Sequence, residues 1–463
     1  MHRRQFIQLG LAAAAAAATR RPAFGRVRPA SSTINEPAMI TFFLRGGNDA
    51  LNTVIPYHDP DYGTVRGGLQ IAYDPANLLA GSSTATNNGV GFHPALPKLR
   101  ARFEDTTAGR TVAMMMRVGN PTGLRSHFTE QDIVETGLVA HDPTAPGWLP
   151  KLVDARAPYM NPTHVMSFAP RLTKLYQTDG SIPSAHFEAP YGPTDSMTNQ
   201  RMLAVDYGGP VRRGFLKRGV QNAFGQPAPT FGDHSNRQVG ADAIDAVDSL
   251  KADLESFDHD ADYDAIPDAY LRARVEDAVQ LMTNTETRYV GLEIGGFDTH
   301  SKQADRHTEL LSTLDEALDV AYRKLADCFS NFLIVVVSEF GRTVEVNGSD
   351  GTDHGVGGLT IALGPGVEGG LYNCHQPSWQ MASHLSYGRP WFPLNQSTNA
   401  YHDNPANMAN PAFRDALIPA VDFRAHFAEI GTKFLGLSAA DIGTAMGTDW
   451  GNIASGPLQG FLR

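Results

Sequence analysis

An unbroken apolar run from Phe332 to Val337 constrains the fold of this chain more than any other feature of its sequence. Such a run is typical of a strand buried on both faces inside a parallel sheet. It ends in SEFGR (338–342), which puts a carboxylate and a guanidinium just past the C-terminal end of the strand. Because ligands bind at that edge of open α/β sheets, the sequence predicts a functional site beside this strand.

Other apolar segments of strand length occur at 39–44, 111–116 and 289–294, and each is followed by a glycine-containing loop. Between the strands, apolar residues at helical spacing over 269–281 and 311–325 predict helices with one buried face. Parallel strands that alternate with helices have their C-terminal ends on one edge. We therefore expect an α/β fold, with a large mostly parallel sheet sandwiched between helices and with loop and cap insertions.

Acidic and imidazole side chains follow these predicted strands. Asp298 and His300 are two residues apart in an extended segment, so they project the same way and can reach one cation together. Carboxylate and imidazole ligands without thiolates suit a divalent ion such as zinc, manganese or calcium, in unknown number. The alternative is a set of salt bridges, caps and loop hydrogen bonds. The candidate metal ligands are Asp49, Asp298, His300, Glu339, Asp353 and His354.

Ser126 stands at or just before the start of a helix predicted over 129–136. There its oxygen can cap free N–H groups, or it can act as a nucleophile activated by a metal or a base. The local sequence by itself favours the cap. The same holds for Asp49, which follows a glycine turn and is also typical of a helix cap.

The N-terminus and the overall charge limit the partners of this chain. Its 463 residues carry a formal net charge of -11, and outside the N-terminus no cluster of Lys and Arg suggests a nucleic-acid partner. RRQFI (3–7) before a short alanine-rich run has the form of a twin-arginine signal, and the run is too short for a permanent membrane anchor. We expect the twin-arginine translocase to export the folded protein to the periplasm or the medium. Cys328 and Cys374 could pair or remain free thiols.

Eight motifs carry a resemblance that covers the chain from about Met39 to Gly436. It is similar to the exported bacterial family of unknown function numbered fifteen hundred and one, which is placed in the alkaline phosphatase and sulfatase superfamily. The resemblance implies an alkaline-phosphatase-like fold with a metal centre at the strand C-termini. It implies Ser126 as the nucleophile equivalent, Asp298 with His300 as a metal pair and His354 as a late ligand. The motifs, in order, are RRQF, FLRGGNDALNT, FHPAL, RSHFTEQDIVETG, GGFDTH, SEFGRT, GTDHG and VDFR.

The residues and the resemblance together predict an exported metal-dependent hydrolase of phosphate or sulfate esters, either small or polymer-borne. Ser126 would attack the ester, and the candidates for charge stabilisation or proton transfer are His127, Arg125 and Arg342. The alternative is a non-catalytic exported binding or assembly protein with a degenerate metal site. It is suggested by Glu339-Phe340, which stands where the superfamily has Asp-His, and by the long aromatic segment 379–410.

The expected organisation of the chain is one large domain with additions. Residues 1–32 are predicted to form the signal peptide and a linker, and 33–440 the alkaline-phosphatase-like domain. Within it, 178–265 is expected to be an insertion or cap, and 441–463 a C-terminal tail.

Overall fold

A computed structural model describes most of the predicted domain. The predicted signal sequence, most of the predicted cap, the aromatic segment 379–410 and Cys374 lie outside the described residues, so predictions about them stay predictions. Within the described part of the chain Cys328 forms no disulfide. The described residues are 33–186, 257–373 and 416–463, with gaps at 58, 60–61, 80–88, 108–109, 121, 143, 158–163, 169–173, 177–184, 418 and 457.

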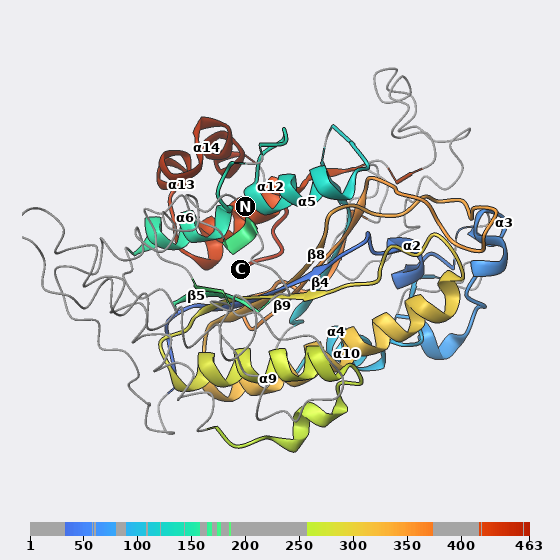
Figure 1. Cartoon of the computed structure of the whole chain (residues 1–463), viewed down its shortest axis with the longest axis horizontal. Coiled ribbons are helices and arrows are strands. Elements are labelled where there is room, and N and C mark those ends of the chain that lie inside the picture. Colours follow the sequence, from blue (N-terminus) through green and yellow to red (C-terminus); the bar gives the residue numbers. More distant parts are fainter. Residues whose placement is uncertain are drawn as a thin grey trace, which may run out of the picture.

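A nine-stranded sheet runs through the centre of the molecule (Figure 1). The strand order is β10-β4-β9-β8-β1-β7-β5-β6, and β11 pairs with β4. The pairings make every strand parallel to β1 except β9, so the predicted mostly parallel sheet is confirmed. The strands are β1 (Ala38–Leu44), β4 (Val112–Gly119), β5 (Val165–Ser167), β6 (Ala185–His186), β7 (Tyr289–Ile294), β8 (Phe332–Ser338), β9 (Gly358–Leu363), β10 (Gly370–Tyr372) and β11 (Val421–Asp422). A separate two-stranded sheet joins β2 (Val54–Ile55) to β3 (Gly91–Phe92).

The register of the central strands decides which loops meet. Leu44, at the end of β1, is level with Ile294 of β7 and with Ser338 of β8. The three strands therefore end at the same height, and the loops that follow them leave from one edge of the sheet. This edge holds most of the predicted site residues.

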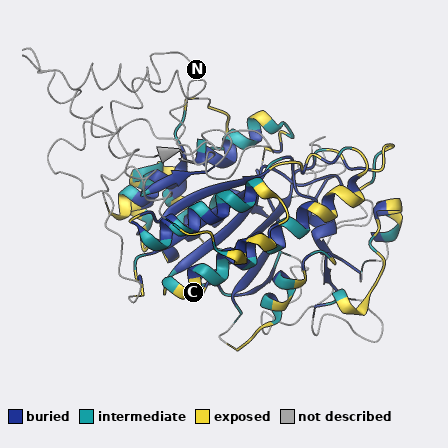
Figure 2. Cartoon of the chain, turned by 60° about the horizontal axis from the view of Figure 1, so that its bottom comes forward, coloured by how far each residue is buried: buried dark blue, intermediate teal, exposed yellow. Residues whose placement is uncertain are grey.

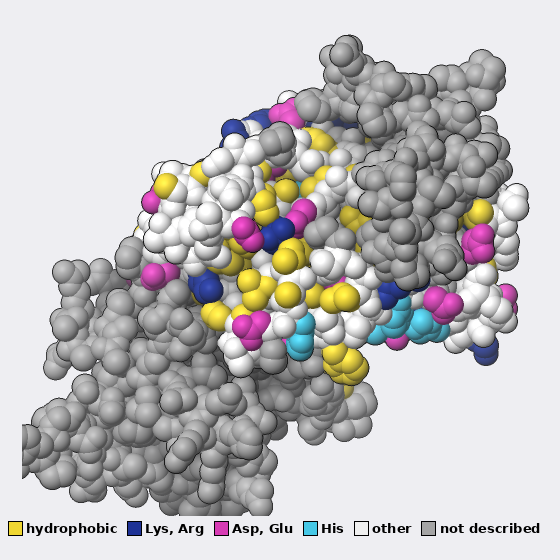
Figure 3. All heavy atoms as spheres, turned by 90° about the horizontal axis from the view of Figure 1, so that it is seen from above, with side chains coloured by type: hydrophobic (Ala, Val, Ile, Leu, Met, Phe, Trp, Pro, Cys, Tyr) yellow, Lys and Arg dark blue, Asp and Glu magenta, His cyan; other side chains and the backbone are white. Residues whose placement is uncertain are grey.

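Helices cover both faces of the sheet, as predicted (Figure 1). Along β1, Phe42 packs into the core on one face and Phe43 into the core on the other, as the two-residue period of a strand requires. The helices α4 (Pro97–Glu104), α9 (Ala269–Asn284) and α10 (Gln303–Cys328) cover the first face, and Figure 2 shows their exposed residues turned away from the sheet. The second is covered by α5 (His127–Thr136), α6 (Trp148–Arg156), α12 (Phe423–Glu429), α13 (Ala439–Met446) and α14 (Thr448–Ser455). On the outer side of this second layer, the described Lys and Arg side chains are scattered among acidic and hydrophobic ones (Figure 3).

The structure differs from the sequence-based expectation at the C-terminus. Where a tail was predicted, α13 and α14 pack on the second face, and Trp450 of α14 is 2% exposed. Its ring lies near Trp148 of α6 and Phe427 of α12, with centroids 6.4 and 6.5 Å apart. Other apolar residues of the segment are also buried in the core of the second face, namely Ile442, Phe461 and Leu462. No helix among the described residues could cross a membrane.

Candidate metal centre

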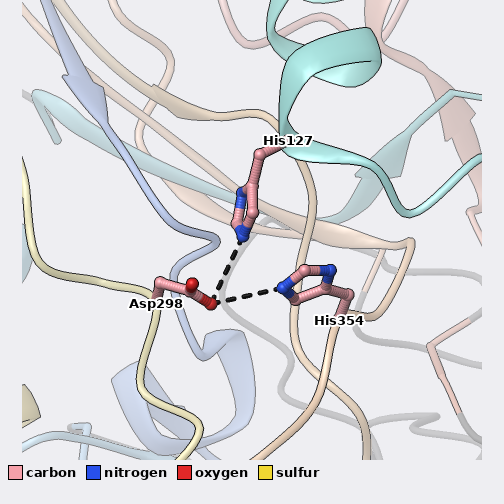
Figure 4. A group of neighbouring side chains, drawn as sticks. All are labelled: His127, Asp298 and His354. Atoms are coloured by element: carbon pink, nitrogen blue, oxygen red, sulfur yellow. Dashed lines mark hydrogen bonds and ion pairs between the residues drawn. The ribbon is translucent and has the colours of Figure 1, made fainter.

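Two loops and the start of a helix bring polar side chains together at the C-terminal edge of the sheet. His127 is the first residue of α5, Asp298 lies in the loop after β7, and His354 lies in the loop after β8. Their side chains point toward one another (Figure 4), and one potential ligand atom of each lies within 4.8 Å of the others. We call this group, together with the neighbouring His300, the histidine cluster.

The distances around Asp298 Oδ1 match the spacing of ligands around one small cation. The Nε2 atoms of His127, His300 and His354 lie 3.3, 3.0 and 3.3 Å from this oxygen. Ligand atoms that are about 2.0–2.1 Å from a tetrahedral zinc ion are about 3.3 Å from one another. The distances from Asp298 Oδ1 are therefore those expected in a ligand shell. The residues whose ligand atoms also lie within 4.8 Å of one another are His127, Asp298 and His354, and His300 adjoins them through Asp298 and His354.

All three imidazoles are oriented in the same way. Each uses Nδ1 to donate a hydrogen bond to an oxygen, and a neutral ring then keeps a lone pair on Nε2. This is the arrangement of histidines that bind metals, whose second nitrogen is held by a carboxylate or a carbonyl group. The acceptors for His127, His300 and His354 are, in turn, Glu339 Oε1 at 2.7 Å, Asp353 Oδ1 at 2.8 Å and the Arg125 carbonyl oxygen at 2.9 Å.

The Nε2 atoms of the cluster need a positive charge between them. Those of His300 and His354 are only 2.8 Å apart, and two lone pairs at that distance repel each other unless a proton or a metal ion lies between them. Nε2 of His127 is buried and meets Asp298 Oδ1 at 3.3 Å, but within the described part of the chain it forms no well-aligned hydrogen bond, which is costly for a polar atom. The cluster thus fits the divalent ion that the sequence predicts.

The charges around the cluster also favour a cation. Burial by itself lowers the pKa of His127, but Glu339 and Asp298 outweigh burial and raise it above the ordinary value. Burial would raise the pKa of Asp298, yet the hydrogen bond from Arg342 and the neighbouring histidines hold it below the usual range. Asp298 therefore stays ionised, and the negative potential that attracts a proton to His127 attracts a metal ion equally.

Arg342 holds the carboxylate of Asp298 in place. Its side chain is fully buried and donates to Asp298 Oδ1 at 2.9 Å, to the Gly46 carbonyl oxygen at 3.0 Å and to the Thr352 carbonyl oxygen. Gly46 has a φ of +118°, and a Cβ there would lie 2.1 Å from the Asp298 nitrogen, so only glycine permits this approach. Arg342 was predicted to act on the substrate; in this structure it positions Asp298.

Glu339 and Asp353, both predicted as metal ligands, lie behind the histidines they orient. Glu339 is 1% exposed, and Oε1 accepts from the Gly46 nitrogen at 2.8 Å and from Gln131 Nε2 at 2.9 Å besides His127. Burial would raise its pKa, but these donors hold it below the usual range. The Glu339 carboxylate contacts Nδ1 of His127, and the Asp353 carboxylate contacts Nδ1 of His300. Both carboxylates therefore lie on the opposite side of the imidazole ring from Asp298, which faces Nε2.

Asp49 is not brought into the histidine cluster. Its carboxylate is 2% exposed, forms a fully buried ion pair with Arg66 and accepts a hydrogen bond from Gln303 Nε2. It also accepts from the Leu51 and Asn52 nitrogens as the N-cap of α2 (Ala50–Thr53). Asp49 is thus a helix cap, the alternative that the sequence also offered, and the structure places it apart from the histidine cluster. Its carboxylate is almost fully buried, whereas that of Asp298 is 46% exposed.

Ser126 occupies the N-cap position of α5, as predicted, but its hydroxyl caps no N–H group. The hydroxyl accepts a hydrogen bond from Thr129 Oγ1 at 3.4 Å and, among the described residues, has none to the histidine cluster. Arg125 has a φ of +55°, and its carbonyl group, rather than its guanidinium, contacts His354. Ser126 thus lies between two residues that are joined to the cluster.

His127 was predicted as a catalytic residue and not as a member of the candidate ligand group, where the structure places it. Its signal in the sequence was the position at the start of a helix, next to a candidate nucleophile. Gln303 and Thr352, which connect Asp49 to Arg342 by hydrogen bonds, were not predicted as site residues either. Gln303 Nε2 donates to Asp49, its Oε1 accepts from Thr352 Oγ1 at 2.6 Å, and Thr352 Oγ1 accepts from Arg342 Nε at 3.3 Å. Nothing in their local sequence marks these two residues.

A mostly parallel sheet covered by helices on both faces, with a histidine and carboxylate cluster at the strand ends, defines an α/β protein with a candidate metal centre. The chain belongs to the family described as "Protein of unknown function (DUF1501)", whose profile matches residues 36–384. Family membership, expected from the motifs, is thereby confirmed. No curated protein matches the chain.

Proposed function

We propose that this protein is an exported, metal-dependent hydrolase of phosphate or sulfate esters, related to the alkaline phosphatase and sulfatase superfamily. The observation that carries the proposal is the convergence of three Nε2 atoms on Asp298 Oδ1, at 3.0 to 3.3 Å. The position of this cluster at the C-terminal edge of a mostly parallel sheet supports an enzyme site, because ligands bind there in α/β proteins.

Three imidazoles and one carboxylate suit zinc best among the candidate ions. The residues that would hold it are His127, Asp298, His300 and His354. When bound, such an ion lowers the pKa of a hydroxyl group and neutralises charge on the oxygens of the ester. Asp298 and His300 are 46% and 43% exposed, so the cluster is open to a substrate on one side, whereas structural zinc sites are closed.

The start of α5 supports an anionic substrate. The first N–H groups of a helix have no partners within it, and at α5 the side chain of the N-cap residue Ser126 caps none of them. Together with the helix dipole, these donors favour the oxygens of a phosphate or sulfate group beside the cluster. We assign Ser126 as the attacking group, which must turn from Thr129 toward the cluster. Its deprotonated oxygen would bond to phosphorus or sulfur while the bond to the organic oxygen breaks, the alcohol would leave with a proton, and water would then hydrolyse the serine ester.

Metal content and hydrolysis of 4-nitrophenyl phosphate and sulfate by the purified protein test the proposal. Chelation should abolish activity and zinc should restore it. His354→Ala should lose both metal and activity, by about a hundredfold or more. Ser126→Ala should keep the metal and lose at least about a hundredfold in kcat/KM. Ser349→Ala, an exposed serine in the loop after β8, is the matched control and should change neither.

The outcomes separate the parts of the proposal. If the metal binds and the wild-type protein cleaves neither ester, the hydrolase is wrong and the non-catalytic binding protein is favoured. If Ser126→Ala is fully active while His354→Ala is inactive, the centre is catalytic and the nucleophile is a water molecule. Export rests on residues 3–7, outside the described part of the chain.

A further inference from the structure

Exposed apolar side chains are concentrated beside the histidine cluster. Among the described residues only three large hydrophobic side chains are exposed: Tyr73 at 44%, Leu124 at 50% and Phe128 at 84%. Two of the three belong to one short segment, 124–128. The same segment contains Ser126 and the candidate ligand His127. Large apolar groups left in water beside a polar site commonly mark a binding surface.

The backbone of this segment is fixed. The Leu124 nitrogen donates to Glu130 Oε1 at 2.8 Å, and Glu130 is 2% exposed. The same carboxylate accepts from Asn120 Nδ2, at 3.2 and 3.1 Å to its two oxygens. Farther along the segment, the Arg125 carbonyl oxygen binds His354 Nδ1 at 2.9 Å, and α5 begins at His127. Leu124 and Phe128 are therefore held at a constant position relative to the cluster.

The fold itself does not use these two side chains. On α5, Ile133 and Val134 are buried in the core of the second face, while Phe128, on the first turn, is the most exposed large hydrophobic residue described. At a position this exposed, a polar residue should change the free energy of unfolding by no more than about 0.5 kcal/mol. Phe128 directly follows the candidate ligand His127 at the start of α5, so the organic part of a ligand whose anionic group lies at the cluster can reach and cover it.

We propose that Leu124 and Phe128 form an apolar subsite for the organic group of the substrate, which is aromatic or otherwise apolar rather than a sugar. This inference rests on the proposed function for the anionic group, at the histidine cluster. Phe128 is thus a specificity-determining residue: it contributes affinity through burial of apolar surface and takes no part in the reaction.

Binding of two pairs of non-hydrolysable anions to the zinc-loaded full chain tests the subsite. Phenylphosphonate and methylphosphonate form one pair, and benzenesulfonate and methanesulfonate the other, so that the preferred head group is found in the same titrations. Calorimetry should show at least one phenyl anion binding about tenfold more tightly than its methyl counterpart. Phe128→Ala should remove most of that preference without changing the affinity for the methyl anion or the zinc content. Phe128→Leu should retain part of it.

Tyr73→Ala, which removes the other exposed aromatic side chain, is the matched control and should leave the preference unchanged. An equal affinity for phenyl and methyl anions in the wild-type protein, or a preference that survives Phe128→Ala, overturns the subsite and leaves these residues to a macromolecular partner. The test does not need turnover. A phenyl preference without hydrolysis upholds the subsite and rejects the enzyme, whereas hydrolysis without a phenyl preference does the reverse.

Discussion

At the scale of single residues, the contact between Glu339 and His127 decides how the imidazole meets a metal ion. The carboxylate is buried and fixed by the Gly46 nitrogen and by Gln131, so it holds the Nδ1 proton and turns Nε2 toward Asp298. An acceptor that is both fixed and charged also makes the imidazole a stronger ligand.

Glu339→Gln should therefore weaken zinc binding by about 10- to 100-fold, because the neutral amide is a poorer acceptor for Nδ1–H. Competition with a chromogenic chelator measures the affinity, and elemental analysis at saturation should still give the wild-type zinc content. Unchanged zinc affinity in this variant would contradict the positioning role. Loss of the bound ion at saturation would instead make Glu339 a direct ligand.

The matched control for this variant is Glu345→Gln. Glu345 is an exposed acid in the same loop, which begins where β8 ends at Ser338. The substitution removes the same charge without touching the contact with His127, so zinc affinity should stay at the wild-type value. An equal loss in Glu345→Gln would show that the effect comes from the net charge of the loop and not from that contact.

The residue scale is also where the sequence predicted least about the site. Residue types and their places after strands predicted that carboxylates and imidazoles gather at one edge. They could not predict which partner each carboxylate meets, because those partners are distant in sequence. Arg66 is 17 residues from Asp49, and the Gly46 nitrogen is 293 residues from Glu339.

At the scale of elements, the end of α5 depends on its contact with α14. Gly137 ends the helix with a φ of +74°, its carbonyl oxygen accepts from Trp450 Nε1 at 2.8 Å, and a Cβ there would lie 2.3 Å from Trp450 Cζ2. Gly436 has nearly the same φ, +73°, but nothing lies within 4 Å of a Cβ built on it. The two glycines share a backbone conformation and differ in their surroundings.

Alanine at both positions separates the two effects. Gly436→Ala should cost about 1 kcal/mol, the penalty of a left-handed conformation for a residue with a Cβ. Gly137→Ala should cost about 1–3 kcal/mol more, since Trp450 must also move. Urea denaturation of both variants measures the free energies of unfolding. An equal loss of unfolding free energy in both variants would mean that Trp450 can move without cost and that α14 does not fix the end of α5.

Strands and helices were predicted well where the pattern of apolar residues within the segment is enough to determine them. The apolar runs at 289–294 and 332–337 became β7 and β8, and the apolar stripe at 311–325 is the buried face of α10. The direction of β9 could not be predicted, because strand direction depends on the connection and not on the residues of the strand. The C-terminal helices were not predicted because each is only eight residues long and therefore shows little more than two turns of an apolar period.

At the scale of the whole molecule, the histidine cluster joins parts of the chain that the sheet only brings near one another. His127 starts α5, while Asp298 and His354 lie in loops after two different strands. An ion that binds all of them is bound only in the folded state, so its binding free energy adds to the free energy of unfolding.

Zinc at about 100 times its dissociation constant should therefore raise the free energy of unfolding by about 2.7 kcal/mol. Thermal unfolding with and without zinc, at fixed protein concentration, measures the change as a shift in Tm. His354→Ala should abolish the shift, because it removes one of the Nε2 atoms around Asp298. His141→Ala is the matched control. His141 follows the C-terminal end of α5, its imidazole is 38% exposed, and it pairs with Asp132 of that helix and not with the cluster. The zinc shift should therefore persist in this variant. A shift of equal size in wild type and His354→Ala would place the stabilising ion elsewhere in the molecule and remove the basis for the proposed centre.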